Sequence, residues 1–231
     1  MEYENLLEIV KNRRSIRKFN PEPIPDEYVD KIIEAARWAP SGANSQPWEF
    51  LVIRKPELRD KIVEFIHESE PLGHKMELVR EPEMRFRRSV PGYVRAPVLI
   101  IMAGDPRTKD AYPLSAKISK GESNFISGLA ISFTYMQLAA CTLGLASQWV
   151  SAIGMPYVQS LTKELLGVPE ELVFYDMLAL GHPDAAFAMK PRSLRPKEEV
   201  IHYDGYDKAK YRTDQQVKDF IADLRGSRPT N

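Results

Sequence analysis

Cysteine is almost missing from this sequence, and its few histidines are scattered. Among 231 residues, Cys141 is the one cysteine, which excludes a disulfide framework and any metal site built from several thiolates. The histidines His67, His74, His182 and His202 lack the spacing of metal ligands. We therefore expect no metal site, and we interpret Cys141 as an inert thiol in an apolar helix.

The sequence also has no excess of either charge. Lys and Arg total 32, as do Asp and Glu, so no overall field attracts nucleic acid or an anionic membrane. Acidic residues stand near the N-terminus, where a secretion signal would be basic. We expect a cytoplasmic protein that binds neither nucleic acid nor membrane.

One long stretch carries no charge at all. It runs from Ser123 to Thr162, and its apolar part is long enough in principle to span a bilayer. Polar residues such as Ser132 and Gln137 are spread along it, however, and Gly144 is typical of a helix end. We predict a helix over about 123–143 that lies in the core or in an oligomer interface.

Three motifs of nucleotide-using and hydrolytic enzymes are absent. The chain has no G-x-G-x-x-G after a strand, no G-x-x-x-x-G-K-[ST] and no G-x-S-x-G. Their absence excludes a Rossmann dinucleotide site, a P-loop and the nucleophile elbow of the hydrolases.

The apolar periodicity predicts an α+β fold. Segments with helical spacing alternate irregularly with short runs rich in β-branched and aromatic residues, which favours a central sheet walled by helices. Helices are predicted near 6–10, 26–39, 56–66, 158–166 and 217–224, and strands at Glu49–Ile53, Pro97–Ala103, Ala146–Ser151 and Val173–Leu180. The regions 67–95 and 181–212 show no clear period, and we expect them to be irregular.

A basic cluster follows the first predicted helix, in the run R-R-S-I-R-K-F from Arg13 to Phe19. Arg13 and Arg17 have the i, i+4 spacing that puts both guanidinium groups on one side if the helical turn continues. With the Ser15 hydroxyl between them, these planar cations suit bidentate hydrogen bonding to a phosphate dianion. A solvated basic turn and a nucleic-acid patch are the alternative interpretations.

A polar loop joins a predicted helix to a predicted strand, in the run A-P-S-G-A-N-S-Q-P-W from Ala39 to Trp48. Its prolines fix the backbone, and Gly42 allows a close approach to a ligand. Ser41, Asn44 and Gln46 supply donors and acceptors that suit the polar edge of a flat heterocycle. An ordinary turn between two elements is the alternative.

Taken together, these segments resemble the nitroreductase family of FMN-dependent flavoproteins. The pattern R-R-S-x-R-x-F is followed about twenty residues later by P-S-x-x-N-x-Q-P-W. Further similarity to family signatures lies in Leu138–Trp149, Leu165–Glu170, Ala179–Pro183 and Arg195–Tyr203. The resemblance covers about residues 5–206.

The resemblance implies an α+β, nitroreductase-like fold with a central mixed sheet flanked by helices. It also implies an intertwined homodimer with two FMN sites at the subunit interface. The whole chain, 1–231, is then one FMN-binding domain, with a lid insertion at about 67–95 and a C-terminal extension at about 181–231.

The resemblance further implies which residues hold a tightly but non-covalently bound FMN. It implies that the phosphate, ribityl chain and pyrimidine edge are held by Arg13, Arg14, Ser15 and Arg17. The partner chain approaches the ring with Pro40, Ser41, Gly42 and Asn44. Backbone N–H groups face the N5 side of the ring from Ser151 and Ala152. A C-terminal basic pair is represented by Arg192 and Arg195, although Leu194 stands where an arginine is common.

The implied activity is transfer of hydride from NAD(P)H through FMN to a nitroaromatic, quinone or similar flat acceptor, by ping-pong kinetics. NAD(P)H would bind only transiently, in keeping with the missing dinucleotide motif. Because the flavin carries the redox chemistry, we predict no catalytic side chain. The aromatic, thioether and guanidinium groups of 67–95 suit a cover over the acceptor.

Specialised functions remain alternatives. A reductive dehalogenase resembling iodotyrosine deiodinase would need a Glu and a Tyr four residues apart in 66–95, and no Glu there has Tyr at that spacing. A flavin-processing enzyme of similar fold carries Asp at the position of Ser15. A non-catalytic flavin-binding protein is the third alternative.

Overall fold

The computed structural model describes residues 2–86, 91–184 and 194–226, in two compact units. The first unit comprises Met1–Glu70 and Pro91–Phe187, and the second comprises Pro71–Val90 and Ala188–Asn231. Each unit is described by itself below. The interpretation of the chain as one domain with an insertion and an extension stays a prediction.

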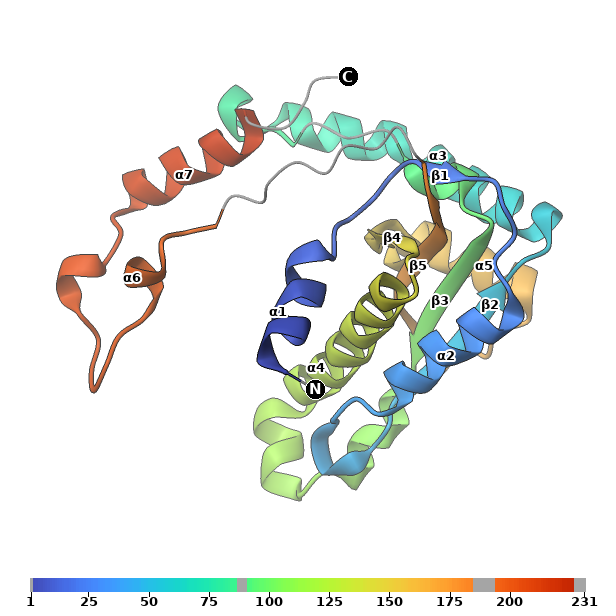
Figure 1. Cartoon of the computed structure of the whole chain (residues 1–231), viewed down its shortest axis with the longest axis horizontal. Coiled ribbons are helices and arrows are strands. Elements are labelled where there is room, and N and C mark those ends of the chain that lie inside the picture. Colours follow the sequence, from blue (N-terminus) through green and yellow to red (C-terminus); the bar gives the residue numbers. More distant parts are fainter. Residues whose placement is uncertain (1, 87–90, 185–193, 227–231) are drawn as a thin grey trace. The chain divides into compact units, whose positions relative to one another are not determined.

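The sheet of the first unit is organised around its two longest strands, β3 and β5, which are adjacent (Figure 1). The strands are β1 (Phe19–Asn20), β2 (Trp48–Ile53), β3 (Val98–Gly104), β4 (Ala146–Val150) and β5 (Val173–Pro183). β5 pairs with β1, β3 and β4, and β3 also pairs with β2, all antiparallel. Within the described ranges, the parallel component of the predicted mixed sheet is reduced to one bridge between Ser15 and Ser147.

Helices cover both faces of this sheet. The first unit holds α1 (Tyr3–Asn12), α2 (Asp26–Arg37), most of α3 (Pro56–Leu78), α4 (Leu114–Thr142) and α5 (Pro156–Leu166). One core layer joins α2 and α4 to the sheet, and the other joins α3 and α5 to its opposite face. β3 is buried along its whole length because its alternating side chains enter both layers.

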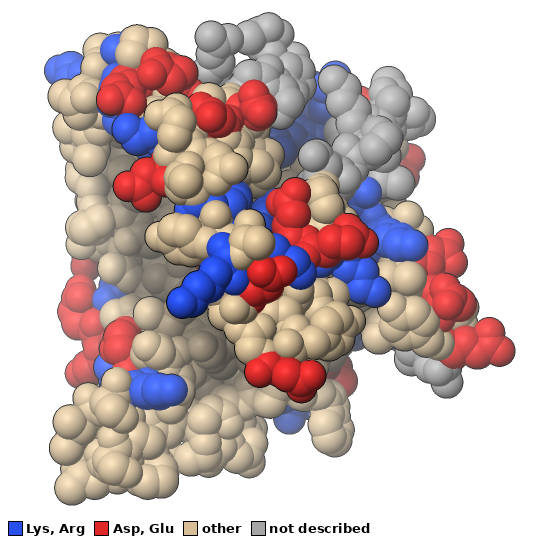
Figure 2. All heavy atoms as spheres, turned by 90° about the vertical axis from the view of Figure 1, so that its left-hand side faces the viewer, with Lys and Arg blue, Asp and Glu red and all other residues tan. Residues whose placement is uncertain are grey.

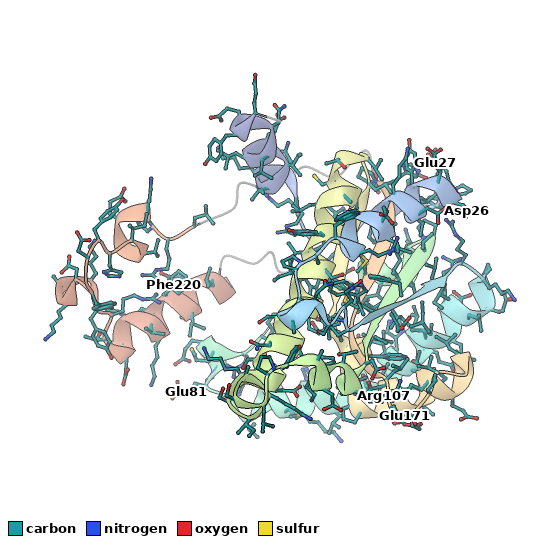
Figure 3. All side chains as sticks on the ribbon, turned by 90° about the horizontal axis from the view of Figure 1, so that it is seen from below. Asp26, Glu27, Glu81, Arg107, Glu171 and Phe220 are labelled. Carbon is teal, nitrogen blue, oxygen red and sulfur yellow. The ribbon has the colours of Figure 1, made fainter. Side chains whose placement is uncertain are left out.

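Local sequence explains where these helices begin and end. Asp26 and Glu27 lie in the first turn of α2 (Figure 3), where acidic groups favour the positive end of the helix dipole. α5 begins at Pro156 and ends at Gly167, whose φ of 65° is left-handed. The predicted helices and strands are all present, and most boundaries shift by a few residues.

Two expected helices differ in extent from the prediction, and one strand was not predicted. α3 continues through Pro71 to Leu78, so the first part of 67–95 is helical rather than irregular. α4 begins at Leu114 instead of near 123, because its charged first turns extend the helix without an apolar period. β1 was not predicted, since two residues are too short to show a pattern.

α4 is long and apolar enough to cross a membrane when judged by length and composition alone. Core helices of soluble proteins pass the same criterion, and the buried stripe of α4 enters the core through Phe125, Leu129, Phe133 and Met136. Other apolar side chains of α4, such as Ile118 and Ile126, are exposed. α4 is therefore buried on one face in this chain, and not on all sides.

The second unit is built from short elements and one longer helix. They include α6 (Lys197–Val200), α7 (Asp214–Gly226) and a turn of 3-10 helix at Pro82–Met84 that packs against α7. Phe220 lies on α7 (Figure 3), and the Arg212 guanidinium stands 5.3 Å from its ring centroid. His202 and Tyr206 are stacked with their ring centroids 4.3 Å apart.

Candidate functional site

The basic cluster follows an extended path beside β4. α1 ends at Asn12, and Arg13 has extended dihedral angles (φ −60°, ψ 122°). The Ile16 N–H donates to the Ser147 carbonyl at 2.9 Å, next to the Ser15–Ser147 bridge. The expectation that a continuing helical turn aligns Arg13 and Arg17 is therefore wrong, because pairing with β4 pulls the segment out of the helix.

The guanidinium groups of this segment contact backbone carbonyls. Arg14 Nη1 donates to the carbonyls of Lys11 and, at 2.9 Å, of Arg13, while Arg17 Nη1 donates to the Ser15 carbonyl at 3.2 Å. Arg14 Nε is buried and has no hydrogen-bond partner among the described residues. A cationic segment with an unsatisfied buried donor fits an anionic ligand, whose oxygens could complete its hydrogen bonding after a small side-chain movement.

Arg13 and Arg14 lie close to the C-terminal end of α4. Burial raises the pKa of the Cys141 thiol, and the charges of Arg13 and Arg14 oppose that rise. The Cys141 Sγ also stands 3.8 Å from the Ile9 carbonyl oxygen of α1. The half-buried position and raised pKa agree with the interpretation of Cys141 as an unreactive thiol.

At its other end, β4 leads into the turn that contains Ser151 and Ala152. This turn is a short 3-10 helix, Ser151–Gly154. Ser147 and Ser151 are four residues apart, which spans roughly 13 Å along a strand. The cationic segment and the Ser151–Ala152 turn are thus held at opposite ends of the same short strand.

A buried carboxyl group that the sequence analysis missed lies behind this turn. Asp176 on β5 is 8% exposed, accepts a hydrogen bond from Trp149 Nε1 at 2.6 Å and is also hydrogen bonded by the Ser151 side chain. Burial raises the pKa of the Asp176 carboxyl to about 6, although both hydrogen bonds act to lower it. The signal in the sequence was a single acidic residue within the apolar strand Val173–Leu180.

An aromatic cluster encloses the same end of β4. Phe133 of α4 packs against Trp149 with ring centroids 4.3 Å apart, and Tyr175 lies 6.0 Å from Phe133 and 6.1 Å from Trp149. The register of β3 against β5 shifts here, since Met102 pairs with Asp176 and Ala103 pairs with Phe174. The extra residue, Tyr175, forms a β-bulge that directs its ring into the cluster.

The polar loop after α2 is held by its own hydrogen bonds. Ser41 Oγ accepts from the Gln46 N–H and the Ser41 carbonyl accepts from the Asn44 N–H, both at 3.0 Å. Asn44 adopts a left-handed conformation (φ 52°), which asparagine tolerates better than most residues. Pro40 and Asn44 are exposed, so they are available to a ligand or to another chain.

The packing around Gly42 gives one reason for a glycine at this position. A Cβ atom at Gly42 would lie 2.9 Å from Tyr112 Cε1 and 3.4 Å from Asn124 Cβ. Tyr112 and α4 therefore occupy the space that a side chain would need, and the approach of the Gly42 backbone to a ligand stays a prediction.

This loop lies at the middle of α4, and the basic cluster lies near the C-terminal end of α4. Ser41 packs near Gly128, where a Cβ atom would lie 3.3 Å from Ser41 Cβ, whereas Arg13 and Arg14 act on Cys141. Gly128 and Cys141 are thirteen residues apart, or about 20 Å along a helix. Within one chain, the two segments are therefore not brought together (Figure 1).

The predicted C-terminal arginines belong to the second unit, whereas the other predicted site residues belong to the first. Arg192 lies outside the described residues. Arg195, in the second unit, donates from Nη2 to the Glu199 carbonyl at 3.4 Å, and its Nε lies 3.6 Å from Glu199 Oε2. It lines a hollow of about 410 Å³ together with His202, Tyr206 and Lys210.

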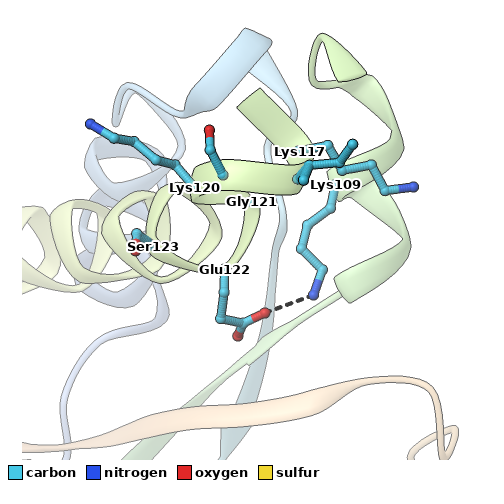
Figure 4. A pocket seen from close by; sticks show the side chains of 8 residues that line it. Lys109, Lys117, Lys120, Gly121, Glu122 and Ser123 are labelled. Carbon is cyan, nitrogen blue, oxygen red and sulfur yellow. Dashed lines mark hydrogen bonds and ion pairs between the residues drawn. The ribbon is translucent and has the colours of Figure 1, made fainter. Parts of the chain in front are cut away.

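A second hollow, of about 320 Å³, lies at the start of α4 (Figure 4). Its lysines are partly paired: Lys109 Nζ is 2.8 Å from Glu122 Oε2, and Lys117 pairs with Asp110. On the molecular face in Figure 2, acidic and basic side chains are interspersed and do not form a patch of one sign. No cluster suited to a metal ion occurs in the described part of the chain.

The chain is similar to a known protein family, to individual sequences and to solved structures. The model of the nitroreductase family matches residues 10–182. A protein of Archaeoglobus fulgidus named "Putative NADH dehydrogenase/NAD(P)H nitroreductase" is 29% identical over 180 residues, covering 78% of this chain and 86% of that protein. Rat iodotyrosine deiodinase 1 is 34% identical over 107 residues, covering 44% of this chain and 38% of that protein.

Solved structures show the same fold. The structure of a nitroreductase with bound FMN from Bacteroides fragilis matches with a TM-score of 0.63 and 26% identity, covering 86% of this chain and 98% of that chain. The predicted family and nitroreductase-like α+β fold are thereby confirmed.

Proposed function

We propose that this chain, which belongs to the nitroreductase family, is an FMN-dependent oxidoreductase that passes hydride from NAD(P)H to a flat aromatic acceptor. The observation that carries this proposal is the placement of the basic cluster and the Ser151–Ala152 turn at the two ends of β4. That spacing suits a ligand with a phosphate at one end and a ring at the other. A similar solved structure is named as containing bound FMN.

The phosphate end is assigned to Arg13, Arg14, Ser15 and Arg17. The guanidinium groups of the three arginines can each donate several charge-assisted hydrogen bonds from a planar fork. This suits a dianionic phosphate better than a single ammonium group would. Arg14, whose Nε is buried without a hydrogen-bond partner among the described residues, would gain an acceptor. Arg192 and Arg195 stay candidates for a further phosphate contact.

The ring end is assigned to the backbone N–H groups of Ser151 and Ala152. When bound, FMN supplies the hydride chemistry, which leaves the chain to bind, orient and stabilise charge. N–H groups fixed by the turn and nearby cations favour negative charge on the ring, because they require no rearrangement when the charge develops. No side chain is assigned as an acid or a base.

A homodimer would complete the site. Since Pro40, Ser41, Gly42 and Asn44 lie about 20 Å along α4 from the basic cluster, we propose that they reach the ring of the partner's FMN. The exposed apolar side chains of α1 and α4, among them Leu6, Val10 and Ile126, supply surface for such a contact.

The acceptor is proposed to enter after NAD(P)H has left, on the same face of the ring, and the kinetics are then ping-pong. Segment 67–95 is proposed to cover it, with Met84 and Phe86 offering polarisable and aromatic contact. A nitroaromatic or a quinone has the flat, electron-poor ring that such a cover suits.

Reductive dehalogenation is the second candidate, because iodotyrosine deiodinases are among the similar proteins. The missing pair of Glu and Tyr four residues apart in 66–95 weighs against recognition of an amino-acid substrate of that kind. Flavin processing and flavin carriage without turnover are the remaining alternatives.

One experiment separates these functions. The purified protein is expected to be yellow, to release FMN on denaturation, and to oxidise NADH or NADPH in steady state with a quinone or nitroarene. Flavin without turnover would indicate a carrier. Turnover with iodotyrosine but not with quinones would favour the dehalogenase, and a protein that binds no flavin would contradict the proposal.

A further inference from the structure

Asp176 occupies an unusual position for a charged side chain. It stands on β5, a strand buried between two core layers, and 8% of its surface is exposed. A carboxyl group in such surroundings is costly unless hydrogen bonds compensate for the lost water. Within the described residues, its two hydrogen-bond partners lie at the end of β4 and in the turn that follows it: Trp149 donates at 2.6 Å, and Ser151 bonds through its side chain.

No cation is among the groups that set the charge of Asp176 in the described part of the chain. Asp176 acts on one titratable neighbour of the same strand, Tyr175. The pKa of Tyr175 is raised by burial and by the charge of Asp176. The elements packed around Asp176 contribute Trp149 from β4, Ser151 from the turn after β4 and the ring of Phe133 from α4. As far as the described residues show, Asp176 is therefore held by hydrogen bonds and not by an ion pair.

We propose that Asp176 is a positioning residue that holds the end of β4 from behind, so that the N–H groups of Ser151 and Ala152 are aimed at the flavin ring. This inference rests on the flavin role proposed above. The Ser151 side chain is hydrogen bonded to the Asp176 carboxyl. The Trp149 indole donates to the same carboxyl and packs against the Phe133 ring. With both side chains held, the backbone between and beyond them has little freedom to turn.

The hydrogen bonds from Trp149 and Ser151 depend on whether the Asp176 carboxyl group is protonated. As a carboxylate, Asp176 accepts from both donors, whereas a protonated carboxyl commits one oxygen to its own proton. Because burial raises the pKa of Asp176 to about 6, the change takes place within a pH range in which flavoproteins can be studied intact.

The first measurement tests the geometry without relying on the flavin. In the full-length protein as purified, the indole N–H resonance of Trp149, identified with Trp149→Phe, is expected to shift with a midpoint near pH 6 in wild type. The shift should be absent in Asp176→Asn and unchanged in Glu49→Gln, which alters an exposed carboxyl on β2. A Trp149 signal that titrates identically in Asp176→Asn would overturn the proposal.

The second measurement tests positioning of the flavin. Asp176→Asn keeps an acceptor for Trp149 and should retain FMN affinity within about threefold, whereas Asp176→Leu should weaken it about tenfold or more. The midpoint potential of the bound flavin should change slope near pH 6 in wild type and Glu49→Gln, and lose this break in Asp176→Asn. If Asp176→Leu does not fold, the pH dependence of the flavin midpoint potential in Asp176→Asn is the deciding measurement for the positioning role.

The outcomes separate this inference from the function on which it rests. If wild type binds no FMN, the proposed function fails and this inference fails with it. If wild type binds FMN and Asp176→Asn keeps the same pH dependence of its potential, the positioning role alone is wrong.

Discussion

The backbone of Arg17 lies directly against Gly92. A Cβ atom at Gly92 would stand 2.4 Å from the Arg17 Cα and 2.5 Å from its carbonyl oxygen. Contacts of that length with backbone cannot be relieved by rotating a side chain. Gly92 therefore fixes how closely the segment before β3 approaches the basic cluster.

Replacing Gly92 with alanine should displace Arg17 and weaken FMN binding. Overpacking of this kind costs about 1–3 kcal/mol of stability, and the shift falls on a residue assigned to the phosphate. FMN affinity is measured by quenching of flavin fluorescence. Gly121→Ala is the control, since a Cβ there meets only Lys117 Cγ at 3.7 Å. Equal affinity in both variants would show that Arg17 does not bind the phosphate.

Removing the Arg17 guanidinium should have a larger and more direct effect. Loss of one charge-assisted hydrogen bond is worth about 1.5–3 kcal/mol, so Arg17→Ala should bind FMN roughly 10- to 150-fold more weakly. Arg37→Ala, at an exposed arginine paired with Glu34, should leave affinity unchanged. Flavin occupancy of Arg17→Ala that survives dilution as in wild type would contradict the assignment.

Mixed dimers test whether each site uses two chains. Arg17→Ala and Asn44→Asp are co-expressed with different tags, and the mixed dimer is isolated. If the basic cluster of one chain and the loop of the other share a site, one site carries both changes and the other carries neither. The mixed dimer should then bind one FMN with wild-type affinity, while neither parent dimer does. Two weakened sites in the mixed dimer would mean that each chain builds its own site.

Stability should respond to pH through Asp176. Its native pKa of about 6 lies above the ordinary value of 3.8, so between these values the folded chain binds a proton that the unfolded chain has lost. The stability that this proton contributes is present at low pH and lost as pH rises through about 6. From about pH 4.5 to about pH 7.5, the free energy of unfolding of wild type should fall by roughly 2 kcal/mol relative to Asp176→Asn.

Urea unfolding at the two pH values, with matched flavin content, measures this difference. The same comparison with Glu49→Gln should show no such trend, because Glu49 is exposed. A constant difference between wild type and Asp176→Asn would mean that the Asp176 carboxyl titrates at its ordinary value.

Local sequence was enough to predict most of the regular elements. The period of Val29, Ile32 and Ala36 marks α2 because each of these side chains enters the core. The conformation of Arg13–Arg17 could not be predicted in the same way. It depends on Ser147, far along the chain, which competes with the α-helix for the backbone of this segment.

Asp176 shows the same limit at the other end of the site. Its position in an apolar strand is visible in the sequence, but its partners are not, since β4 and β5 are joined by a pairing between distant segments. The end of α3 was missed for a different reason. Pro71 normally argues for the end of a helix, yet α3 continues past it to Leu78.

The pairing of β1 with β5 also limits how early the N-terminal part of the sheet can form during synthesis. Phe19 lies opposite Pro183, and Asn20 lies opposite His182, so the basic cluster beside β1 acquires its neighbours only after most of the polypeptide has left the ribosome. Contacts between such distant segments form slowly, because a long loop must close before they gain any energy. The N-terminal strand β1 is thus made early in synthesis and can pair only late, after β5 has been made.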